Sequence, residues 1–232
     1  MNFDYRDLAK MVDHSLLNPT LGPEDLENGC RLAMLFDVAS VCIMPFAVSG
    51  AAAMLSDSDV AVGTTVGFPH GVNTTAVKEA EAEQAMRDGA VELDMVINIP
   101  LAVSGRVDEI EEEVSRLAAT AHSGGARLKV IFENCFLSDS VKIALCQACG
   151  RAGADWVKTS TGYGDGGAVD ADLVLMRRHS PETVQVKAAG GVRTLDRLLE
   201  VRDLGCSRVG ATRTAGILNE ARTRLGLEPI HG

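Results

Sequence analysis

Short apolar segments alternate with helix-like segments along the whole chain, and this alternation limits its fold more than any other feature. Eight runs of five to nine residues, most of them rich in Val and Ile, have the composition of buried β-strands. They occupy residues 11–17, 39–44, 60–68, 91–97, 127–133, 155–160, 184–190 and 207–212. Strands that alternate with helices through short connections must lie parallel to one another.

The segments between these runs have the periodicity of amphipathic helices, most clearly at 23–37, 75–89 and 107–125. Acidic residues crowd their first turns, where the helix dipole favours negative charge, and two of the three end in glycine. A glycine, a small residue and a strand follow one another in four places: DGAVELDMV, GGARLKVIF, AGADWVKTS and LGCSRVGAT. Each of these is a helix stop that leads directly into a strand.

The number of strand–helix units favours a closed barrel. Eight units in 232 residues, about 29 residues each, fit a single (β/α)8 TIM barrel that spans residues 1–232 as one domain. The alternative is a doubly wound open sheet, which usually has five or six strands. No G-x-G-x-x-G motif follows the first predicted strand, which further disfavours that fold.

Composition excludes several classes of protein. A net charge of −10 argues against nucleic-acid binding through a broad basic surface. No run approaches the length of a membrane span, and the charged N-terminal segment does not resemble a signal peptide, so we expect a cytoplasmic protein. The scattered cysteines do not suggest a disulfide framework. Cys146 and Cys149 form a CxxC inside an apparent helix and are interpreted as buried thiols.

Three charged residues stand near the ends of different predicted strands. Lys158 ends the run at 155–160, Lys187 lies late in the run at 184–190, and Asp94 lies late in the run at 91–97. In a TIM barrel the C-terminal ends of the strands converge on one pocket, which holds the active site. We therefore expect these three side chains to meet.

Such a set is suited to imine chemistry. A lysine amine attacks a carbonyl only when it is uncharged, and burial or a second ammonium group nearby favours that form. The neutral amine can form a Schiff base with an aldehyde or ketone, and the iminium then accepts electrons as a carbon–carbon bond breaks. In this hypothesis Lys158 is the nucleophile, Lys187 lowers its pKa, and Asp94 transfers protons.

Other interpretations of these residues remain open. Either lysine could instead form a structural ion pair with Glu92 or Glu133. Lys129 lies earlier in its strand, so a structural pair with Glu133 or Asp94 is at least as plausible for it as a role in the site. The five histidines have no metal-ligand spacing, and we expect neither a metal nor an organic cofactor.

Glycine-rich loops after the last two strands suggest an anion site. The segments AAGGVRT and GATRTAG follow the runs at 184–190 and 207–212, where many barrels bind phosphate. Gly190 and Gly191 would let backbone N–H groups approach an anion, and Arg193 and Arg213 would add positive charge. These glycines could alternatively serve only to make tight turns.

Seven segments together resemble the successive motifs of the deoxyribose-phosphate aldolase family, class I aldolases on a TIM barrel. They are DHSLLNPT, VCIMP, TTVGFPHG, ELDMVIN, KVIFENC, GADWVKTSTGYG and VKAAGGVRT, and the resemblance runs from about residue 11 to 212. It implies that Lys158 forms the Schiff base, Lys187 tunes it and Asp94 relays protons. It also implies reversible cleavage of 2-deoxyribose 5-phosphate to glyceraldehyde 3-phosphate and acetaldehyde without a cofactor.

The resemblance extends to the substrate-binding residues. Thr161 and Cys42 would line the pocket, with Lys129 nearby, and Gly210 and Thr212 would help to hold the phosphate. Two positions depart from the family pattern. Thr212–Arg213 replaces a pair of serines, and Asn18 stands where the family often has lysine.

Arg213 would bind a carboxylate as well as a phosphate, so the sequence leaves open which anionic group the substrate carries. One alternative is therefore a Schiff-base lyase or dehydratase that acts on a sugar acid. Another is a barrel that binds sugar phosphates without turnover. The expected partner is a small anionic aldol substrate, and a homodimer is one expectation for the assembly.

Overall fold

The computed structural model describes residues 3–231, in which eight parallel strands close into one barrel with β1 paired to both β2 and β8. The (β/α)8 prediction is thus confirmed, and each strand falls inside its predicted run. The strands are β1 (Val12–Leu16), β2 (Ser40–Ile43), β3 (Ala61–Val66), β4 (Glu92–Val96), β5 (Arg127–Ile131), β6 (Trp156–Lys158), β7 (Gln185–Ala189) and β8 (Arg208–Ala211).

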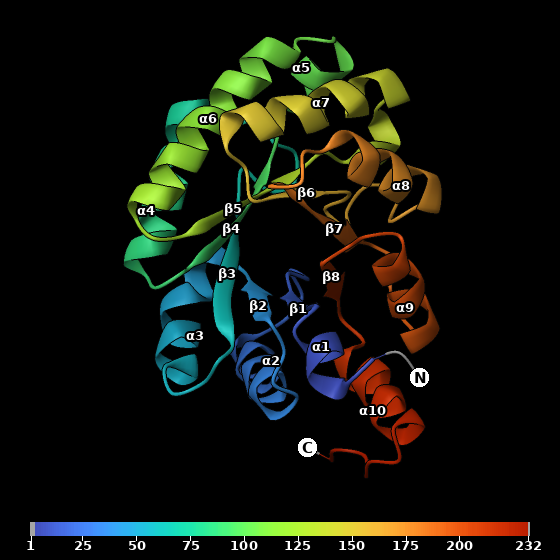
Figure 1. Ribbon diagram of the computed structural model, residues 1–232. Helices are drawn as coiled ribbons and strands as arrows, with labels where there is room; N and C mark the ends of the chain where they lie inside the picture. Colours follow the sequence, from blue (N-terminus) through green and yellow to red (C-terminus); the bar gives the residue numbers. More distant parts are fainter. Residues whose placement is uncertain (1–2, 232) are drawn as a thin grey trace.

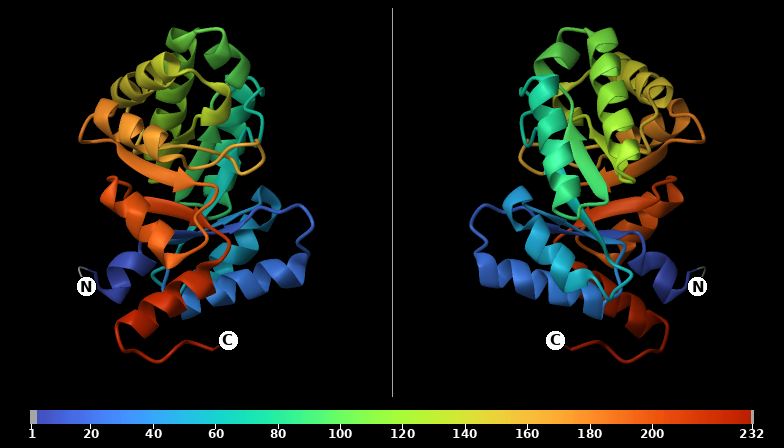
Figure 2. Two further views of the ribbon diagram at one scale, coloured as in Figure 1. Left: turned by 90° about the vertical axis from the view of Figure 1, so that its right-hand side faces the viewer. Right: turned by 90° about the vertical axis from the view of Figure 1, so that its left-hand side faces the viewer.

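Helices surround the strands as an outer layer (Figure 1). They are α1 (Tyr5–Ala9), α2 (Pro23–Leu35), α3 (Val48–Leu55), α4 (Thr75–Arg87), α5 (Ile99–Val103), α6 (Val107–Ser123), α7 (Asp139–Ala152), α8 (Asp170–His179), α9 (Leu195–Asp203) and α10 (Thr214–Arg224), with short 3-10 helices η1 (Pro45–Ala47) and η2 (Asn134–Phe136). Helices α1 and α10 pack together near the two ends of the chain (Figure 2).

Most predicted glycine stops end helices as expected. Gly89, Gly125 and Gly153 follow α4, α6 and α7 with positive φ angles of 106°, 76° and 83°. A backbone in this region is tolerated best by glycine, because it has no Cβ to clash with the following carbonyl. After α2 the same conformation is taken by Asp37 (φ 50°), whose carboxylate lies 2.6 Å from the Lys10 ammonium group.

The strands have an apolar outer face and a polar inner face. Val12, Leu93, Val130, Val157 and Val186 belong to the buried apolar core, whereas the residues that alternate with them along each strand are mostly polar. Barrel interiors are usually filled by branched apolar side chains. Here buried charges take their place, and the period of two along each strand directs these charges inward.

A network of ion pairs fills the middle of the barrel. Lys129 Nζ lies 2.6 Å from Glu92 and 2.9 Å from Asp13, and all three side chains are fully buried. Arg208 donates hydrogen bonds to the same two carboxylates. The Trp156 ring lies beneath this network, with the Arg208 guanidinium 5.3 Å from its centroid. Since each carboxylate meets more than one cation, the network ties β1, β4, β5 and β8 together.

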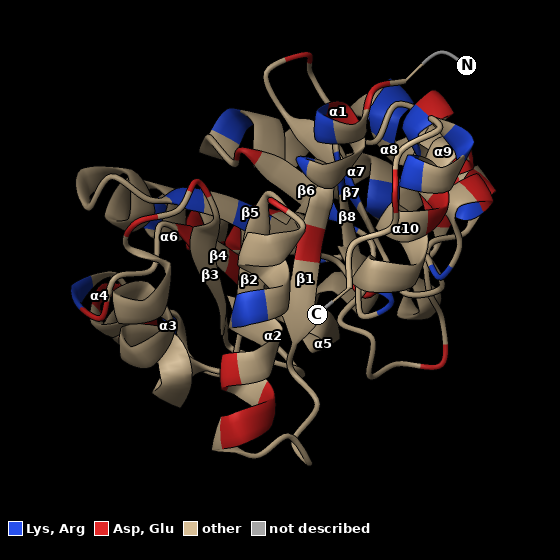
Figure 3. Cartoon of the chain, turned by 90° about the horizontal axis from the view of Figure 1, so that it is seen from below, with Lys and Arg blue, Asp and Glu red and all other residues tan. Residues whose placement is uncertain are grey.

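The surface of the barrel carries charges of both signs. Acidic and basic residues are interspersed around α8, α9 and α10 in the view from below (Figure 3). Within residues 3–231, no helix combines the length and apolar character needed to cross a bilayer.

Removal of Lys129 should destabilise the barrel. In Lys129→Met, Asp13 and Glu92 would stay buried with one cation fewer, and loss of one partner from a buried ion pair costs about 3–5 kcal/mol. Urea unfolding should show this loss of free energy of unfolding. Arg87→Met is the control, because its pair with Glu83 is exposed and its loss should cost less than about 0.5 kcal/mol. Equal midpoints for the two variants would contradict a structural role for the network.

Candidate active site

The barrel brings Lys158 and Lys187 side by side. They are register partners on β6 and β7, and both point inward because their neighbours Val157 and Val186 belong to the apolar outer face. Asp94 projects from β4, two residues after Glu92 and therefore on the same inner face. The three predicted catalytic residues thus meet near the C-terminal ends of the strands.

Asp94 contacts both lysines with one oxygen. Its Oδ2 accepts hydrogen bonds from Lys158 Nζ at 2.6 Å and from Lys187 Nζ at 2.8 Å. Its Oδ1 lies 3.1 Å from Lys129 Nζ. The carboxylate is fully buried, and its pKa is held far below the usual range because the three ammonium groups outweigh the effect of burial. Asp94 therefore remains an anion.

The buried charges around Asp94 leave one cation in excess when every lysine is charged. Asp13, Glu92 and Asp94 supply three buried negative charges, and Lys129, Lys187 and Arg208 supply three buried positive charges. Arg127 also reaches Glu92, but its side chain is 48% exposed and water screens its charge. A charged Lys158 would be a fourth buried cation. Because burial of an uncompensated charge is costly, the interior favours the neutral amine at this position.

The pKa shifts of the two lysines run in opposite directions. Burial lowers the pKa of Lys158 below 10.5, with a further contribution from the nearby Lys187, and together they outweigh the opposing effect of Asp94. For Lys187 burial acts the same way, but the carboxylates of Asp13 (2.5 Å) and Asp94 outweigh it and raise the pKa. Lys158 consequently loses its proton more readily than Lys187.

This balance corrects one part of the sequence-based hypothesis. The neighbouring cation was expected to hold Lys158 in its neutral form. In the structure burial has the largest effect on the pKa of Lys158. The lowering of this pKa by Lys187 is smaller than the raising of it by Asp94. The direction of the shift is as expected, but most of it arises from removal of the amine from water.

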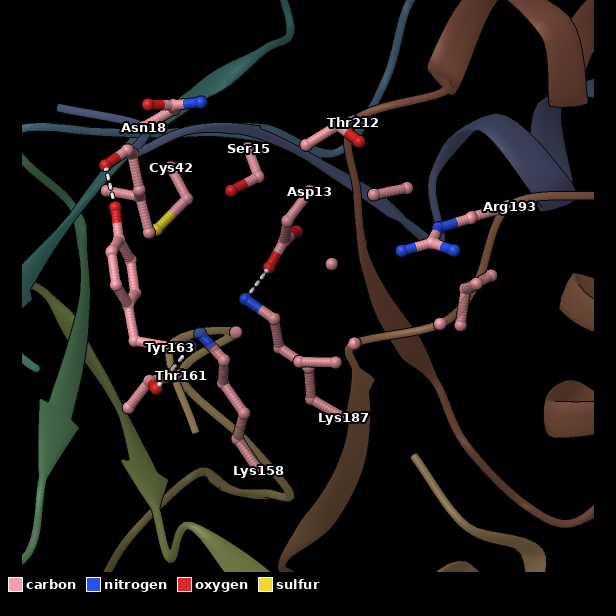
Figure 4. A pocket seen from close by; sticks show the side chains of 18 of the residues that line it. Asp13, Ser15, Asn18, Cys42, Lys158, Thr161, Tyr163, Lys187, Arg193 and Thr212 are labelled. Atoms are coloured by element: carbon pink, nitrogen blue, oxygen red, sulfur yellow. Dashed lines mark hydrogen bonds and ion pairs between the residues drawn. The ribbon is translucent and has the colours of Figure 1, made fainter. Parts of the chain in front are cut away.

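Lys158 and Lys187 lie on the wall of a cavity of about 510 Å³ (Figure 4). Nine of the twelve predicted site residues line it: Cys42, Lys158, Thr161, Lys187, Gly190, Gly191, Arg193, Gly210 and Thr212. Figure 4 shows Tyr163 and Arg193 at opposite sides of the cavity, with the two lysines between them.

Three predicted residues do not line the cavity. Asp94 lies beneath the two lysines and is fully buried. Lys129 lies deeper still and binds Asp13, Glu92 and Asp94, so it is a structural ion-pair residue and does not pair with Glu133. Arg213 is exposed at the N-cap of α10, outside the cavity lining. The prediction that Arg213 contacts the anion is therefore not supported by its position.

Several lining residues were not among the predicted ones. Asp13 and Ser15 project inward from β1, and Asn18 and Tyr163 come from the loops after β1 and β6. The period of two along the run at 11–17 would have placed Asp13 and Ser15 on one face. No comparable signal exists for Asn18 or Tyr163, because the direction of a loop side chain does not follow a fixed period.

The loops after β7 and β8 form the end of the cavity that contains Arg193. Gly190 and Gly191 have positive φ angles of 84° and 90°, and the space beside Gly191 is open. Gly190 packs so closely on Gly167 that a Cβ there would lie 2.9 Å from the Gly167 Cα. Glycine backbone that lines the cavity, and the Arg193 guanidinium just before α9, suit an anionic group.

The segment after Lys158 is held by Glu133. The Glu133 carboxylate accepts hydrogen bonds from the backbone N–H and hydroxyl groups of Thr161, and the Thr161 hydroxyl accepts one from the Tyr163 N–H at 2.9 Å. Glu133 itself has a left-handed backbone (φ 55°). This clamp fixes the first residues of the glycine-rich loop beside Lys158.

The cysteines are thiols without disulfide partners. Cys42 lies in the cavity wall, where burial raises the pKa of its thiol to about 11. Cys146 and Cys149 are buried within α7, as predicted, and burial raises the pKa of both. Among residues 3–231, no cluster of His, Cys, Asp and Glu side chains has the arrangement of a metal site. The expectation that no metal is needed stays a prediction.

Comparisons with known proteins identify the family of this chain. The model of a family described as DeoC/LacD family aldolase matches residues 7–216. The deoxyribose-phosphate aldolase of Rhodopirellula baltica is 55% identical over 229 residues, which cover 99% of this chain and 95% of that protein. The deoxyribose-phosphate aldolase of Caldanaerobacter subterraneus is 43% identical over 215 residues, covering 92% of this chain and 93% of that protein.

A solved structure has the same fold. The tetrameric deoxyribose phosphate aldolase from Aeropyrum pernix superposes with a TM-score of 0.89 at 29% sequence identity, over 95% of this chain and 93% of that one.

Proposed function

The chain belongs to the DeoC/LacD family of aldolases, and we propose that it cleaves 2-deoxy-D-ribose 5-phosphate reversibly to D-glyceraldehyde 3-phosphate and acetaldehyde through a Schiff base on Lys158. The observation that carries this proposal is a buried lysine of lowered pKa that lines a cavity with an anion-compatible end. Relatives named deoxyribose-phosphate aldolase support the choice of substrate.

The first step is formation of the imine. The neutral Lys158 Nζ attacks the C1 carbonyl of the open-chain sugar, and uptake of one proton with loss of water leaves an iminium. The bond between C2 and C3 then breaks, its electron pair moves toward the iminium nitrogen, and the 3-hydroxyl group gives up its proton. Glyceraldehyde 3-phosphate leaves, and an enamine of acetaldehyde remains on Lys158. Protonation at C2 and hydrolysis release acetaldehyde and restore the amine.

We infer that Lys187 moves the protons in these steps. It lines the cavity, whereas Asp94 lies beneath it and is fully buried. Asp94 can therefore exchange a proton with the substrate only through an amine or a water molecule above it. In this proposal Lys187 is the proton carrier, and Asp94 and Asp13 set its charge and orientation by their ion pairs at 2.8 and 2.5 Å.

The alternative functions have weaker support. A lyase that reads the carboxylate of a sugar acid would depend on Arg213, which lies outside the cavity lining. A barrel that only binds sugar phosphates would not need a buried lysine of lowered pKa, since a charged lysine attracts phosphate better.

We also propose that residues 1–232 act as a single barrel domain in the cytoplasm and assemble as a homodimer. The six free cysteines suit a reducing compartment. A surface for self-association is suggested by Phe46, which is 73% exposed beside an apolar hollow formed by Leu26, Ile43 and Met54.

Borohydride trapping tests the Schiff base. Incubation with 2-deoxyribose 5-phosphate and borohydride should attach a reduced adduct to the peptide that contains Lys158, because borohydride reduces the imine to a stable amine. Lys158→Met removes the amine without adding a buried charge, so it should give no adduct and lose turnover by at least about 10³-fold. Mass spectrometry of the digested protein shows which peptide carries the adduct, and an assay of aldehyde release measures turnover. An adduct on Lys187 instead would reverse the proposed roles.

A pair of arginine variants tests the phosphate end. Arg193→Gln should raise KM for 2-deoxyribose 5-phosphate by about 10- to 100-fold, the effect of losing a hydrogen bond between charged groups. The rate with unphosphorylated 2-deoxyribose should change little, because that substrate has no anion to bind. Arg213→Gln is the matched control and should leave both rates within about twofold of wild type. A larger effect of Arg213→Gln than of Arg193→Gln would show that the phosphate lies elsewhere.

A further inference from the structure

Glu133 is a buried carboxylate whose hydrogen-bond partners come from a single residue. It follows β5 and is 2% exposed. Within residues 3–231, its carboxylate accepts hydrogen bonds from the N–H and hydroxyl groups of Thr161, and no ammonium or guanidinium group forms an ion pair with it. Buried carboxylates are usually paired with a cation. The negative charge of Glu133 is instead directed at Thr161.

The backbone keeps this carboxylate in one position. The N–H groups of the two neighbours, Phe132 and Asn134, donate hydrogen bonds to carbonyl oxygens of Lys158 and Thr159 at 3.0 and 2.9 Å. Glu133 between them has a φ of 55°, a left-handed conformation that is unfavourable for a residue with a Cβ. Because both neighbours are tied to the chain that leaves β6, Glu133 cannot relax from this conformation without breaking those hydrogen bonds.

The hydrogen bonds around the Thr161 hydroxyl fix the direction of its proton. A hydroxyl group has one proton to donate and two lone pairs that accept. The proton is donated to Glu133, and one lone pair accepts from the Tyr163 N–H at 2.9 Å. One lone pair is left, and Thr161 lines the cavity that contains Lys158 (Figure 4). Toward a molecule in this cavity, the hydroxyl is therefore an acceptor and not a donor.

An acceptor of this kind distinguishes between groups of a substrate. It binds the O–H of a sugar hydroxyl, but it offers no proton to carbonyl or phosphate oxygens, which only accept. The end of the cavity with Arg193 suits the phosphate, as described above. Open-chain 2-deoxyribose 5-phosphate has hydroxyl groups on C3 and C4 that can donate, whereas acetaldehyde has none.

We propose that Glu133 is a positioning residue that makes Thr161 a hydrogen-bond acceptor for a hydroxyl group of the substrate, so that the pair selects hydroxylated aldehydes. This inference rests on the proposed aldolase function, because it concerns the sugar that forms the imine with Lys158. Glu133 is not among the residues that line the cavity, so it acts through Thr161 and does not touch the substrate.

The direction of the hydroxyl proton can be tested without any substrate. In the wild-type protein, the Thr161 hydroxyl proton should exchange slowly with water and be visible by NMR, because a buried carboxylate holds it. In Glu133→Met the acceptor is gone, and this proton should exchange at least about tenfold faster. The result stays meaningful even if 2-deoxyribose 5-phosphate proves not to be a substrate. Equal exchange rates in the two proteins would overturn the proposal.

A comparison of two aldehydes tests the selection of hydroxyl groups. Thr161→Val removes the hydroxyl at similar volume, and kcat/KM for 2-deoxyribose 5-phosphate should fall about tenfold or more, since a polar group of the sugar loses its partner. Thr161→Ser keeps the hydroxyl and should stay within about threefold of wild type. Borohydride trapping of acetaldehyde on Lys158 should change less than about twofold in both variants. Equal losses for the two aldehydes would contradict the proposal, because they would indicate a general disturbance of the site.

A double-mutant cycle tests whether Glu133 acts through Thr161. Glu133→Met alone should lower kcat/KM for 2-deoxyribose 5-phosphate about tenfold, but added to Thr161→Val it should cause less than about twofold further loss. Glu81→Met is the matched control, because the Glu81 carboxylate holds the loop after β3 through the Gly67 N–H at 2.6 Å. It should leave kcat/KM within about twofold of wild type. Full additivity of the Glu133 and Thr161 changes would overturn the proposal.

Discussion

The contact of one Asp94 oxygen with two lysine amines is the interaction on which the rest of the site depends. It places Lys158 and Lys187 within 2.6 and 2.8 Å of the same atom, inside a barrel in which all three side chains are buried. If both amines were cations, four buried positive charges would face the three carboxylates of Asp13, Glu92 and Asp94. The network beneath, built from Asp13, Glu92, Lys129 and Arg208, already balances its own charges. Lys187 also pairs with Asp13 of this network, and its pKa is raised whereas that of Lys158 is lowered.

The barrel makes this arrangement possible because parallel strands bring residues from distant parts of the sequence to one end. Asp94 and Lys187 are 93 positions apart and share a hydrogen bond. The same geometry places the loops after β6, β7 and β8 around the cavity, where glycines let backbones approach one another. The buried charges inside the barrel therefore affect both the stability of the fold and the reactivity of the Lys158 amine. These charges would destabilise the barrel if they were unpaired, and they also influence how strongly the Lys158 amine holds its proton.

Much of this could be predicted from the sequence. The eight strands follow from regular spacing, and the meeting of Lys158, Lys187 and Asp94 follows from strand ends that converge in a closed barrel. The partners of Asp13 could not be found in this way, since Lys129 and Arg208 lie 116 and 195 positions away. The position of Arg213 outside the cavity depends on the backbone of a turn, as does the place of Tyr163 in the cavity wall. Burial causes most of the lowered pKa of Lys158, and the charges of Asp94 and Lys187 modify it in opposite directions.

Direct measurement of the two amine protonation states would test the central claim most sharply. In protein labelled with ¹⁵N-lysine, the Nζ resonances of Lys158 and Lys187 can be followed by NMR as the pH is raised. A lowered pKa means that the amine loses its proton earlier in this titration, and a raised pKa means that it does so later. The account predicts that Lys158 deprotonates below pH 10.5 and before Lys187. Deprotonation of Lys187 first, or of Lys158 at or above that pH, would contradict it.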